Sequence, residues 1–455
     1  MSSSVTSTTE LGLRPWLSAT ASFRDGTDSP RDYLERCIAV IEAHEPDVGA
    51  FVSTNLERSR ADADAANDRW RTGQQLSAVD GMPLGIKDIM ETADMPTEQG
   101  SPLFAGWRGR RDSAAVSALR EAGAIILGKT VTTEFAATEP RGTRNPWDLT
   151  RTPGGSSSGS AAAVGLGMLP AALGTQVIGS IIRPASFCGA FGYKPSVGGL
   201  NRGGSFDAFS QSSTGVIGAS LEDTWTVTRE ISSRVGGDPG YPGVSGPMSI
   251  PPATMPRRIA MLHTAGWDAA SDESKGALAT SCDRLKAVGC DVVDSSSDVN
   301  VGAVEDAIAE AMPLSRGINA WEGRWPLNTY AQDMSRNLLS KTMQDRLDVA
   351  NRMTQDEYRG LLAERHRARE IYERLKASCD ACVTLSATGA APHGLESTGD
   401  PAVTVPTSLL GVPTLSLPVL RAEGLPLGLQ VIGFADDDAA LFAVAASVMN
   451  LFDRT

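Results

Sequence analysis

Two Gly/Ser-rich stretches hold the residues of this chain that are best suited to covalent chemistry. Residues 154–160 read GGSSSGS and residues 174–180 read GTQVIGS, so Ser156 and Ser180 stand 24 residues apart. A serine hydroxyl attacks a carbonyl carbon efficiently only when a base takes its proton. A lysine amine becomes such a base when burial lowers its pKa. Lys87 is a candidate, because the apolar stretch MPLGIKDIM (82–90) indicates a short buried strand around it.

A second interpretation places the nucleophile one residue further on. Residues 155–159 (GSSSG) match the GxSxG nucleophile elbow, which would make Ser157 the nucleophile of an α/β-hydrolase-like esterase. That motif needs a preceding strand, a following helix, and a downstream acid and histidine. Of the four histidines, His393 comes late enough in the chain to serve, but the preceding TRTPGG is a poor strand. Ser157 is kept as an alternative nucleophile.

Two further motifs are expected to bind no cofactor. Residues 123–130 (GAIILGKT) fit GxxxxGK[ST], but a phosphate loop follows a strand and opens a helix, whereas here a predicted helix precedes an apolar strand. Cys379 and Cys382 form a lone CxxC pair with no second pair and no histidine nearby, which favours two ordinary reduced cysteines. We therefore expect no nucleotide, metal or other cofactor.

The serine and lysine motifs occur together with other segments in a set order. GIKD (85–88), GGSSSGSAAA (154–163), GTQVIGSIIRPASFCG (174–189) and GYKP (192–195) precede TGDPAVTVPTSLLGVPTLSLP (398–418) and GLPLGLQVIG (424–433). This set, with its serine spacing, resembles the amidase signature family from about residue 30 to the end of the sequence. The resemblance implies a hydrolase that cleaves an amide-type C–N bond. Carbamates (urethanes) and esters are further substrate classes, because all react through a tetrahedral oxyanion.

The resemblance also implies roles for individual residues. Ser180 corresponds to the nucleophile that forms an acyl-enzyme, Ser156 to a bridging serine after a cis Gly155–Ser156 peptide bond, and Lys87 to the terminal base. Together they would form a Ser-cisSer-Lys triad. The oxyanion hole would use the backbone N–H groups of the turn before the nucleophile: Val177, Ile178 and Gly179.

The chain departs from the usual family pattern around the nucleophile. The common Asp-Thr-Gly-Gly-Ser and Ile-Arg-Ile-Pro segments are replaced by QVIGS (176–180) and IIRP (181–184). The pattern GTQxxGSxIRPA resembles a malonamidase-like branch, in which the arginine lies near the substrate. Gly155, Gln176 and Arg183 are accordingly candidate substrate-binding residues; Arg183 would bind a carboxylate or carbonyl, or would equally serve to brace the loop. Ile178 stands where the family has glycine, and a β-branched residue is unfavourable wherever φ is positive.

Alternating strands and helices must position these residues. Helices are expected from residue 30 onward and at 56–72, 114–122, 160–166 and 273–288, and strands at 82–90, 124–127, 257–264, 290–294, 383–388, 411–420 and 428–434. This alternation favours an α/β layer fold. The family resemblance implies a single large α/β/α domain around a mixed, largely parallel sheet.

The predicted organisation is an N-terminal arm (1–29) followed by one amidase signature domain (30–455). Within the domain, the stretch at about 303–376 is predicted to be mostly helical and to contribute to the substrate pocket. Met312, Trp321, Trp325 and Leu338 lie in this stretch. They suit a hydrophobic or aromatic acyl or leaving group, and they suit an ordinary core equally well.

Composition limits the partners of the chain. Its 455 residues are 41% hydrophobic and 21% charged, and the net charge of −13 disfavours binding to nucleic acids and to anionic membranes. The sequence shows no secretory signal and no apolar run of the roughly 18–20 residues that cross a bilayer, so a cytoplasmic location is expected. A small-molecule substrate is the first expectation, and a homodimer is left open. The alternative from another class is a glutaminase-type subunit of a tRNA-dependent amidotransferase complex.

Overall fold

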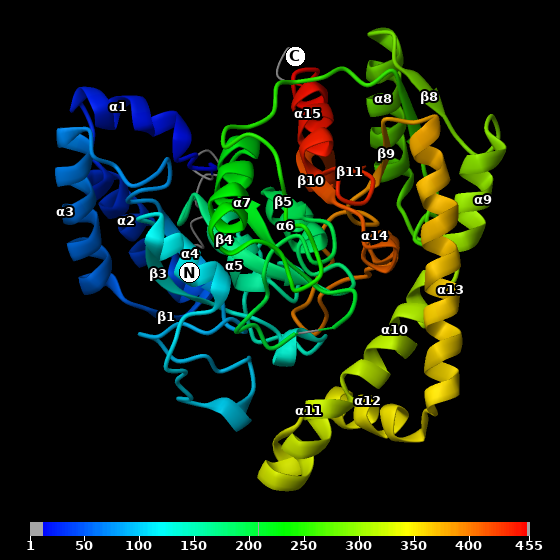
Figure 1. The fold of residues 1–455 in the computed structure, drawn as a ribbon, viewed down its shortest axis with the longest axis horizontal. Helices are drawn as coiled ribbons and strands as arrows, with labels where there is room; N and C mark the ends of the chain where they lie inside the picture. Colours follow the sequence, from blue (N-terminus) through cyan, green and yellow to red (C-terminus); the bar gives the residue numbers. More distant parts are fainter. Residues whose placement is uncertain (1–11, 208, 453–455) are drawn as a thin grey trace, which may run out of the picture.

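The computed structural model describes residues 12–207 and 209–452, and in this part of the chain eleven strands form one sheet (Figure 1). Their order across the sheet is β1-β3-β2-β4-β6-β5-β10-β11-β9-β7-β8. The strands are β1 (Phe51–Thr54), β2 (Pro83–Lys87), β3 (Ile125–Thr130), β4 (Ala171–Gln176), β5 (Phe191–Lys194), β6 (Ser213–Gly218), β7 (Arg258–Met261), β8 (Asp291–Val293), β9 (Ala381–Leu385), β10 (Thr414–Ala422) and β11 (Leu425–Ile432). Helices pack on both faces, which confirms a single α/β/α domain around a mixed sheet.

Parallel and antiparallel pairs occupy different parts of the sheet. Parallel pairing joins β3-β2-β4 and, separately, β9-β7-β8. The other neighbours, from β4 through β6, β5, β10 and β11 to β9 and at the β1 edge, are antiparallel. The parallel strands therefore form two blocks with antiparallel strands between them. In the first block the carboxyl ends of β2 and β4 lie side by side, and α/β folds place ligand sites at such ends.

Local signals in the sequence set the helix ends. Ser29 caps α2 (Pro30–Val48) by accepting a hydrogen bond from a first-turn N–H group, Pro30 occupies the first turn, and Gly49 ends the helix with φ of 63°. α3 (Leu56–Thr72) has the bounds that the sequence predicts. These capping signals explain why helix limits were easier to predict than helix packing.

One face of the sheet is covered by α5 (Ser158–Gly165) and α6 (Ile182–Cys188), with α2 beside them. All residues of α5 and α6 are buried. The small side chains of α5 allow a close approach, since a Cβ atom on Gly159 would lie 2.1 Å from the carbonyl oxygen of Ala50. This packing holds the start of α5, next to the first serine motif, against the sheet.

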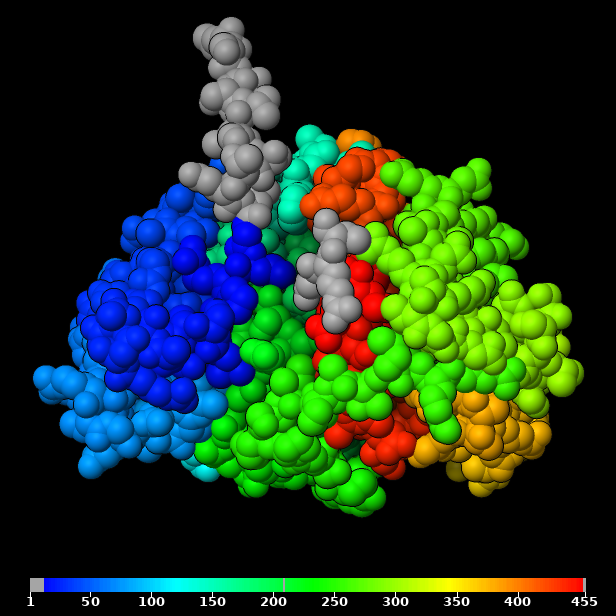
Figure 2. Space-filling model, turned by 90° about the horizontal axis from the view of Figure 1, so that it is seen from above, coloured from blue at the N-terminus to red at the C-terminus, as the bar shows by residue number. Residues whose placement is uncertain are grey.

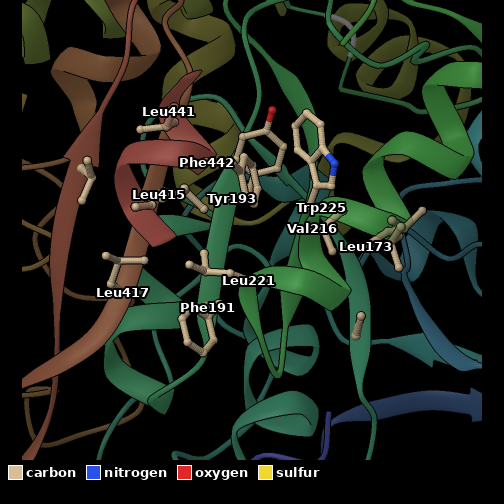
Figure 3. Packing of buried hydrophobic residues seen from close by; sticks show 14 of the residues in the cluster. Leu173, Phe191, Tyr193, Val216, Leu221, Trp225, Leu415, Leu417, Leu441 and Phe442 are labelled. Carbon is tan, nitrogen blue, oxygen red and sulfur yellow. The ribbon is translucent and has the colours of Figure 1, made fainter. Parts of the chain in front are cut away.

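Four helices cover the opposite face: α4 (Ala114–Glu121), α7 (Leu221–Val235), α8 (Asp272–Ala287) and α15 (Asp438–Met449). Tyr193 of β5, Trp225 of α7 and Phe442 of α15 come together there, and the Phe442 ring centroid lies 4.8 Å from each of the other two (Figure 3). Trp225 is fully buried, and its indole N–H donates to the carbonyl oxygens of Pro247 and Ser249. This aromatic group anchors α7 and α15 to the sheet.

The stretch at about 303–376, which was predicted to be mostly helical, is helical in the structure. It lies to one side of the sheet (Figure 1). Its helices are α9 (Val299–Ile308), α10 (Ala311–Glu322), α11 (Arg324–Thr329), the π-helix η5 (Tyr330–Ser335), η6 (Arg336–Leu338), α12 (Lys341–Arg352) and α13 (Gln355–Glu373). α10 and α13 pack against α14 (Val405–Leu410) through an apolar cluster that includes Leu314, Ile318 and Leu409. None of the helices in the described part of the chain is long and apolar enough to cross a membrane.

The predicted N-terminal arm (1–29) falls partly outside the described residues, because residues 1–11 are not described. From residue 12 the chain packs onto the domain. Trp16 and Phe23 are buried in the main core, and the Trp16 backbone N–H donates to the Asp223 carboxylate at 2.9 Å. Residues 16–25, which include α1 (Thr20–Asp25), thus form part of the domain (Figure 2).

Replacing Trp225 by alanine is expected to lower the free energy of unfolding by about 3–5 kcal/mol, because it removes a fully buried indole from a packed core. Urea denaturation followed by circular dichroism measures the loss. Trp325→Ala is the matched control, since the Trp325 side chain is 72% exposed and its removal should cost less than about 1 kcal/mol. Equal losses in the two variants would contradict this description of the core.

Candidate active site

Three polar atoms surround the amine of Lys87 at the carboxyl end of β2. Its Nζ lies 2.7 Å from Ser156 Oγ, 2.8 Å from Thr175 Oγ1 and 3.3 Å from the Thr175 carbonyl oxygen. Thr175 belongs to β4, which pairs in parallel with β2, so the sheet itself brings these groups together. Lys87 is fully buried and has no carboxylate within ion-pair distance among the described residues.

Burial makes the neutral form of this amine accessible at ordinary pH. Desolvation disfavours the ammonium form and lowers the pKa of Lys87 to about 7, while the negative charge of Asp207 acts in the opposite direction. Asp207 is itself buried, and its carboxylate accepts hydrogen bonds from the hydroxyl groups of Ser205 and Ser212. An amine whose pKa is near 7 can both accept and return a proton.

Ser156 lies in the turn that leads into α5, directly after a cis peptide bond between Gly155 and Ser156. The cis bond implied by the family resemblance is therefore present. The Ser156 hydroxyl faces Lys87, and its carbonyl oxygen accepts the N–H of Thr133 at 3.3 Å. Only 1% of Ser156 is exposed, which suits a group that transfers protons inside the protein.

Ser180 lies in the turn between β4 and α6. Its carbonyl oxygen accepts the N–H of Ser157 at 3.2 Å, which joins the second serine motif to the first. The exposed fraction of Ser180 is 8%, so Ser180 is more open to a substrate than Ser156. The structure thus places Ser156 beside Lys87 and joins the backbone of Ser180 to the first serine motif.

Gln176 supports the turn that carries Ser180. Its Oε1 accepts the N–H groups of Ile181 and Ile182 at 2.9 and 3.0 Å, and its Nε2 donates to Ser408 Oγ at 3.1 Å. Both ends of this buried amide are therefore engaged inside the protein. Gln176 is a candidate for substrate binding, and in the structure its side chain supports the turn.

The turn before Ser180 presents unused hydrogen-bond donors. The backbone N–H groups of Val177, Ile178 and Gly179 have no acceptor among the described residues. Gln211 holds the turn from outside, because its Nε2 donates to the Val177 carbonyl oxygen at 3.0 Å. A Cβ atom on Gly179 would lie 2.1 Å from Thr404 Oγ1, so only glycine fits there. Free N–H groups held in this way can stabilise an oxyanion.

Ile178 does not suffer the backbone conflict that the sequence suggested. It is not among the residues with positive φ. Its side chain packs against the cluster formed by α10 and α14, which includes Leu314 and Leu409. The isoleucine that replaces a family glycine therefore joins the turn to the helical segment.

Arg183 braces the first serine motif from α6. Its Nη2 donates to the Gly155 carbonyl oxygen at 2.7 Å and to Thr398 Oγ1 at 3.0 Å, and its Nε donates to the Thr398 carbonyl oxygen at 2.7 Å. Its Nη1 is buried without a partner in the described part of the chain and would lie 3.0 Å from a Cβ atom on Gly179. Burial lowers the pKa of Arg183 to about 10, so the guanidinium group remains charged at neutral pH.

The alternative nucleophile, Ser157, has its hydroxyl group engaged elsewhere. Ser157 is fully buried, and its Oγ lies 3.3 Å from both the carbonyl oxygen and the N–H nitrogen of Thr175. His393 lies on the surface, where its Nδ1 is 3.2 Å from Thr150 Oγ1. The structure brings no histidine to Ser157, and it does not support a nucleophile elbow.

The two other motifs have structural explanations. Lys129, in the stretch that fits a phosphate loop, is a buried residue of β3 and forms an ion pair with Asp88 at 2.9 Å. Cys379 and Cys382 are free and buried. No group of His, Cys, Asp or Glu side chains in the described ranges is arranged to hold a metal ion.

Sequence reasoning missed five residues that position the site: Thr175, Asp207, Gln211, Thr398 and Ser408. Thr175 lies inside the GTQVIGS motif, directly before Gln176. Its position near Lys87 could therefore have been predicted from that motif. Asp207 and Gln211 come from segments without a recognised role, whereas Thr398 and Ser408 lie in the 398–418 segment, for which no individual residue had been assigned a role. Gln211, for example, reaches Val177 because β6 pairs with β4 through Ser213 and Gln176.

Comparison with known proteins places this geometry in context. A family model described as Amidase matches residues 32–442. The A subunit of glutamyl-tRNA(Gln) amidotransferase from Chloroflexus aggregans is 32% identical over 463 residues, which cover 93% of each chain. The protein of the same name from Anaeromyxobacter sp. (strain K) is also 32% identical, over 96% of this chain and 95% of its own.

Solved structures share the fold over nearly the whole chain. One described as an amidase superposes with a TM-score of 0.83 at 26% identity and covers 96% of this chain and 99% of its own. A second, described as an unexpected vestigial protein complex that reveals the evolutionary origins of an s-triazine catabolic enzyme, has the same TM-score and identity and covers 96% and 98%. A 6-aminohexanoate cyclic dimer hydrolase, at 23% identity and a TM-score of 0.83, shares the fold.

Replacing Lys87 by methionine is expected to stabilise the protein at and below about pH 7. The pKa of Lys87 is 10.5 when unfolded and about 7 when folded, so between these values the unfolded chain binds the extra proton and wild-type stability rises with pH. The advantage of Lys87→Met should be full below pH 7 and vanish towards pH 10.5.

Thermal unfolding of both proteins at pH 6, 8 and 10 measures this difference. Lys341→Met, which replaces an exposed lysine, is the control and should show no such trend. A stability difference between Lys87→Met and wild type that does not change with pH would show that Lys87 keeps an ordinary pKa.

Proposed function

Because the chain belongs to the amidase signature family, we propose that it hydrolyses an amide-type C–N bond of a small molecule through an acyl-enzyme on Ser180. The observation that carries this proposal is the buried amine of Lys87, 2.7 Å from Ser156 Oγ and without a carboxylate partner among the described residues. An unpaired, desolvated lysine is costly to bury, and accepting a proton from Ser156 gives it a use.

Proton transfer follows from the groups around Lys87. A neutral amine has two hydrogens and one lone pair. The Thr175 hydroxyl and carbonyl oxygens accept the two hydrogens, so the lone pair is free for the hydroxyl hydrogen of Ser156. Ser156 can then take the proton of Ser180 as the Ser180 oxygen attacks the substrate carbonyl carbon.

The remaining steps use the same groups in reverse. The tetrahedral oxyanion binds to the free N–H groups of the turn at Val177, Ile178 and Gly179, and one such donor lowers a barrier by about 3 kcal/mol. Lys87 returns its proton through Ser156 to the leaving nitrogen, and the C–N bond breaks. A water molecule, deprotonated along the same route, attacks the acyl-enzyme and regenerates Ser180.

Arg183 supports an acyl group that carries a further carbonyl or carboxylate oxygen. Of the three nitrogens of its guanidinium group, Nη1 has no hydrogen-bond partner among the described residues, and it lies beside Gly179 at the catalytic turn. A buried charged donor in this position favours an acceptor on the substrate. Gly155, whose carbonyl oxygen accepts from Arg183, would position the guanidinium group rather than bind substrate.

Carbamates and esters are included in the proposed substrate range. Both present a carbonyl carbon to Ser180 and generate the same oxyanion as an amide. An ester leaving group needs less help from a proton donor, so esters are expected to depend less on the return of a proton through Ser156.

The second candidate function is that of a subunit in a tRNA-dependent amidotransferase complex. The observation in its favour is the 32% identity over 93% of the chain to proteins of that name. The free hydrolase is preferred because the turn before Ser180 departs from the usual family pattern at Gln176, Val177 and Ile178, and because Arg183 places a charge beside that turn.

Activity of the purified chain, without partner protein, tRNA or ATP, is expected on a panel of p-nitroanilides, aryl carbamates and p-nitrophenyl esters. Ser180→Ala and Lys87→Ala should lower kcat about 1,000-fold or more, because each removes an essential part of one relay. Ser157→Ala is the matched control and should stay within about tenfold of wild type, since the Ser157 hydroxyl contacts only the β4 backbone.

Two outcomes would contradict this assignment. Loss of activity in Ser157→Ala with full activity in Ser180→Ala would make Ser157 the nucleophile. Turnover that appears only in the presence of a partner protein would favour the amidotransferase function.

A further inference from the structure

A surface hollow lies where α10, α11 and α13 meet the loop before β6. Its volume is about 470 Å³, within the range of small-molecule sites. It is lined by Ser210, Trp321, Glu322, Arg324, Trp325 and Tyr358. Three of these six side chains are aromatic, which is unusual for a surface that has no partner.

The aromatic side chains line one side of the hollow as a stack. The Trp321 and Tyr358 rings are stacked, with centroids 5.4 Å apart and an interplanar angle of 15°. The Arg324 guanidinium carbon lies 4.5 Å from the Trp321 ring centroid. The Trp325 indole is 72% exposed, so it offers an unoccupied aromatic surface beside this stack.

The two charged side chains of the hollow, Glu322 and Arg324, differ in whether they can still bind a ligand. Both Glu322 oxygens are occupied: they accept from the backbone N–H and the hydroxyl of Ser210 and from the Tyr358 hydroxyl. Arg324, by contrast, forms no ion pair with any carboxylate in the described residues; its contact is with the face of Trp321. The charged group that is left to bind a ligand directly is therefore the Arg324 guanidinium.

The hollow is connected to the catalytic turn through adjacent residues of one loop. Ser210 is bound to Glu322 in the hollow, and the next residue, Gln211, donates to the Val177 carbonyl oxygen in the oxyanion turn. The Oε1 atom of Gln211 is buried without a partner in the described part of the chain. A molecule that fills the hollow therefore lies against the loop that holds the turn before Ser180.

We propose that this hollow binds the end of the substrate remote from the scissile bond, and that this end is a planar aromatic ring bearing a carboxylate. The inference rests on the proposed hydrolase function and specifies its substrate class. The ring stacks on the Trp325 indole, and the carboxylate pairs with the Arg324 guanidinium group. Stacking and charge together select an aromatic acid over an aliphatic acid or an uncharged aromatic compound.

Binding is measured in the Ser180→Ala variant, so the result does not depend on turnover. The probes are 2-naphthoate, 2-naphthamide and cyclohexanecarboxylate, titrated by calorimetry. We expect saturable binding of 2-naphthoate at least tenfold tighter than that of either other probe. Trp325→Ala and Arg324→Gln, each added to Ser180→Ala, should weaken 2-naphthoate binding at least tenfold. Val299→Ala removes an exposed side chain of α9 outside the hollow and should leave the affinity unchanged.

Two results would overturn the proposal. One is 2-naphthoate affinity that neither Trp325→Ala nor Arg324→Gln changes. The other is a shift in oligomeric state in Trp325→Ala with unchanged affinity, which would assign the hollow to contact with a second copy of the chain. If the wild-type chain hydrolyses no amide but the expected binding pattern is found, the proposed function fails while the site stands. If amides are hydrolysed without that pattern, the hydrolase stands and this site fails.

Discussion

A lysine amine buried without an opposing carboxylate is the constraint on which the rest of the site depends. Two fully buried lysines lie near the carboxyl ends of neighbouring parallel strands: Lys87 is the last residue of β2, and Lys129 is the residue before the last in β3. The nearby carboxylate of Asp88 forms an ion pair with Lys129, and this pair favours the charged form of Lys129 while burial lowers its pKa. Lys87 is left with hydroxyl and carbonyl oxygens, and its neutral form is favoured. Because Asp88 pairs with Lys129 and not with Lys87, Lys129 has a structural role and Lys87 is available as a base.

Close backbone packing then fixes the two serines relative to this amine. The first motif leads into α5, which approaches the sheet so closely that Gly159 admits no side chain. The second motif leaves β4 through a turn that Gly179, Gln176 and Gln211 hold from different sides. Rigid support of this kind keeps reacting groups within a few tenths of an ångström, which proton transfer and oxyanion stabilisation both require.

The sequence predicted most of the local structure and the central residues of the site. Residues at helical spacing predicted α2, a helix was also predicted at the bounds of α3, and apolar runs predicted β2 and β3. The order of the sheet was beyond the sequence, because no local pattern shows that β6 lies between β4 and β5 or that the parallel strands form two separate blocks. For the same reason the contacts of Gln211 and Thr398, and those by which Gln176 supports the turn, could not be predicted. A motif identifies reactive residues within one segment, whereas these contacts depend on how segments that are distant in the sequence pack together.

The pH dependence of covalent labelling by phenylmethylsulfonyl fluoride tests the central claim most directly, because it reports the nucleophile and its base together. The labelled position is located by peptide mass analysis, and the labelling rate is measured between about pH 5.5 and 9.5. The account predicts an adduct on Ser180 and a rate that rises with pH and levels off above an apparent pKa of about 7, the value that burial gives Lys87. An adduct on Ser157, or a rate on Ser180 that still rises at pH 9.5, would contradict it.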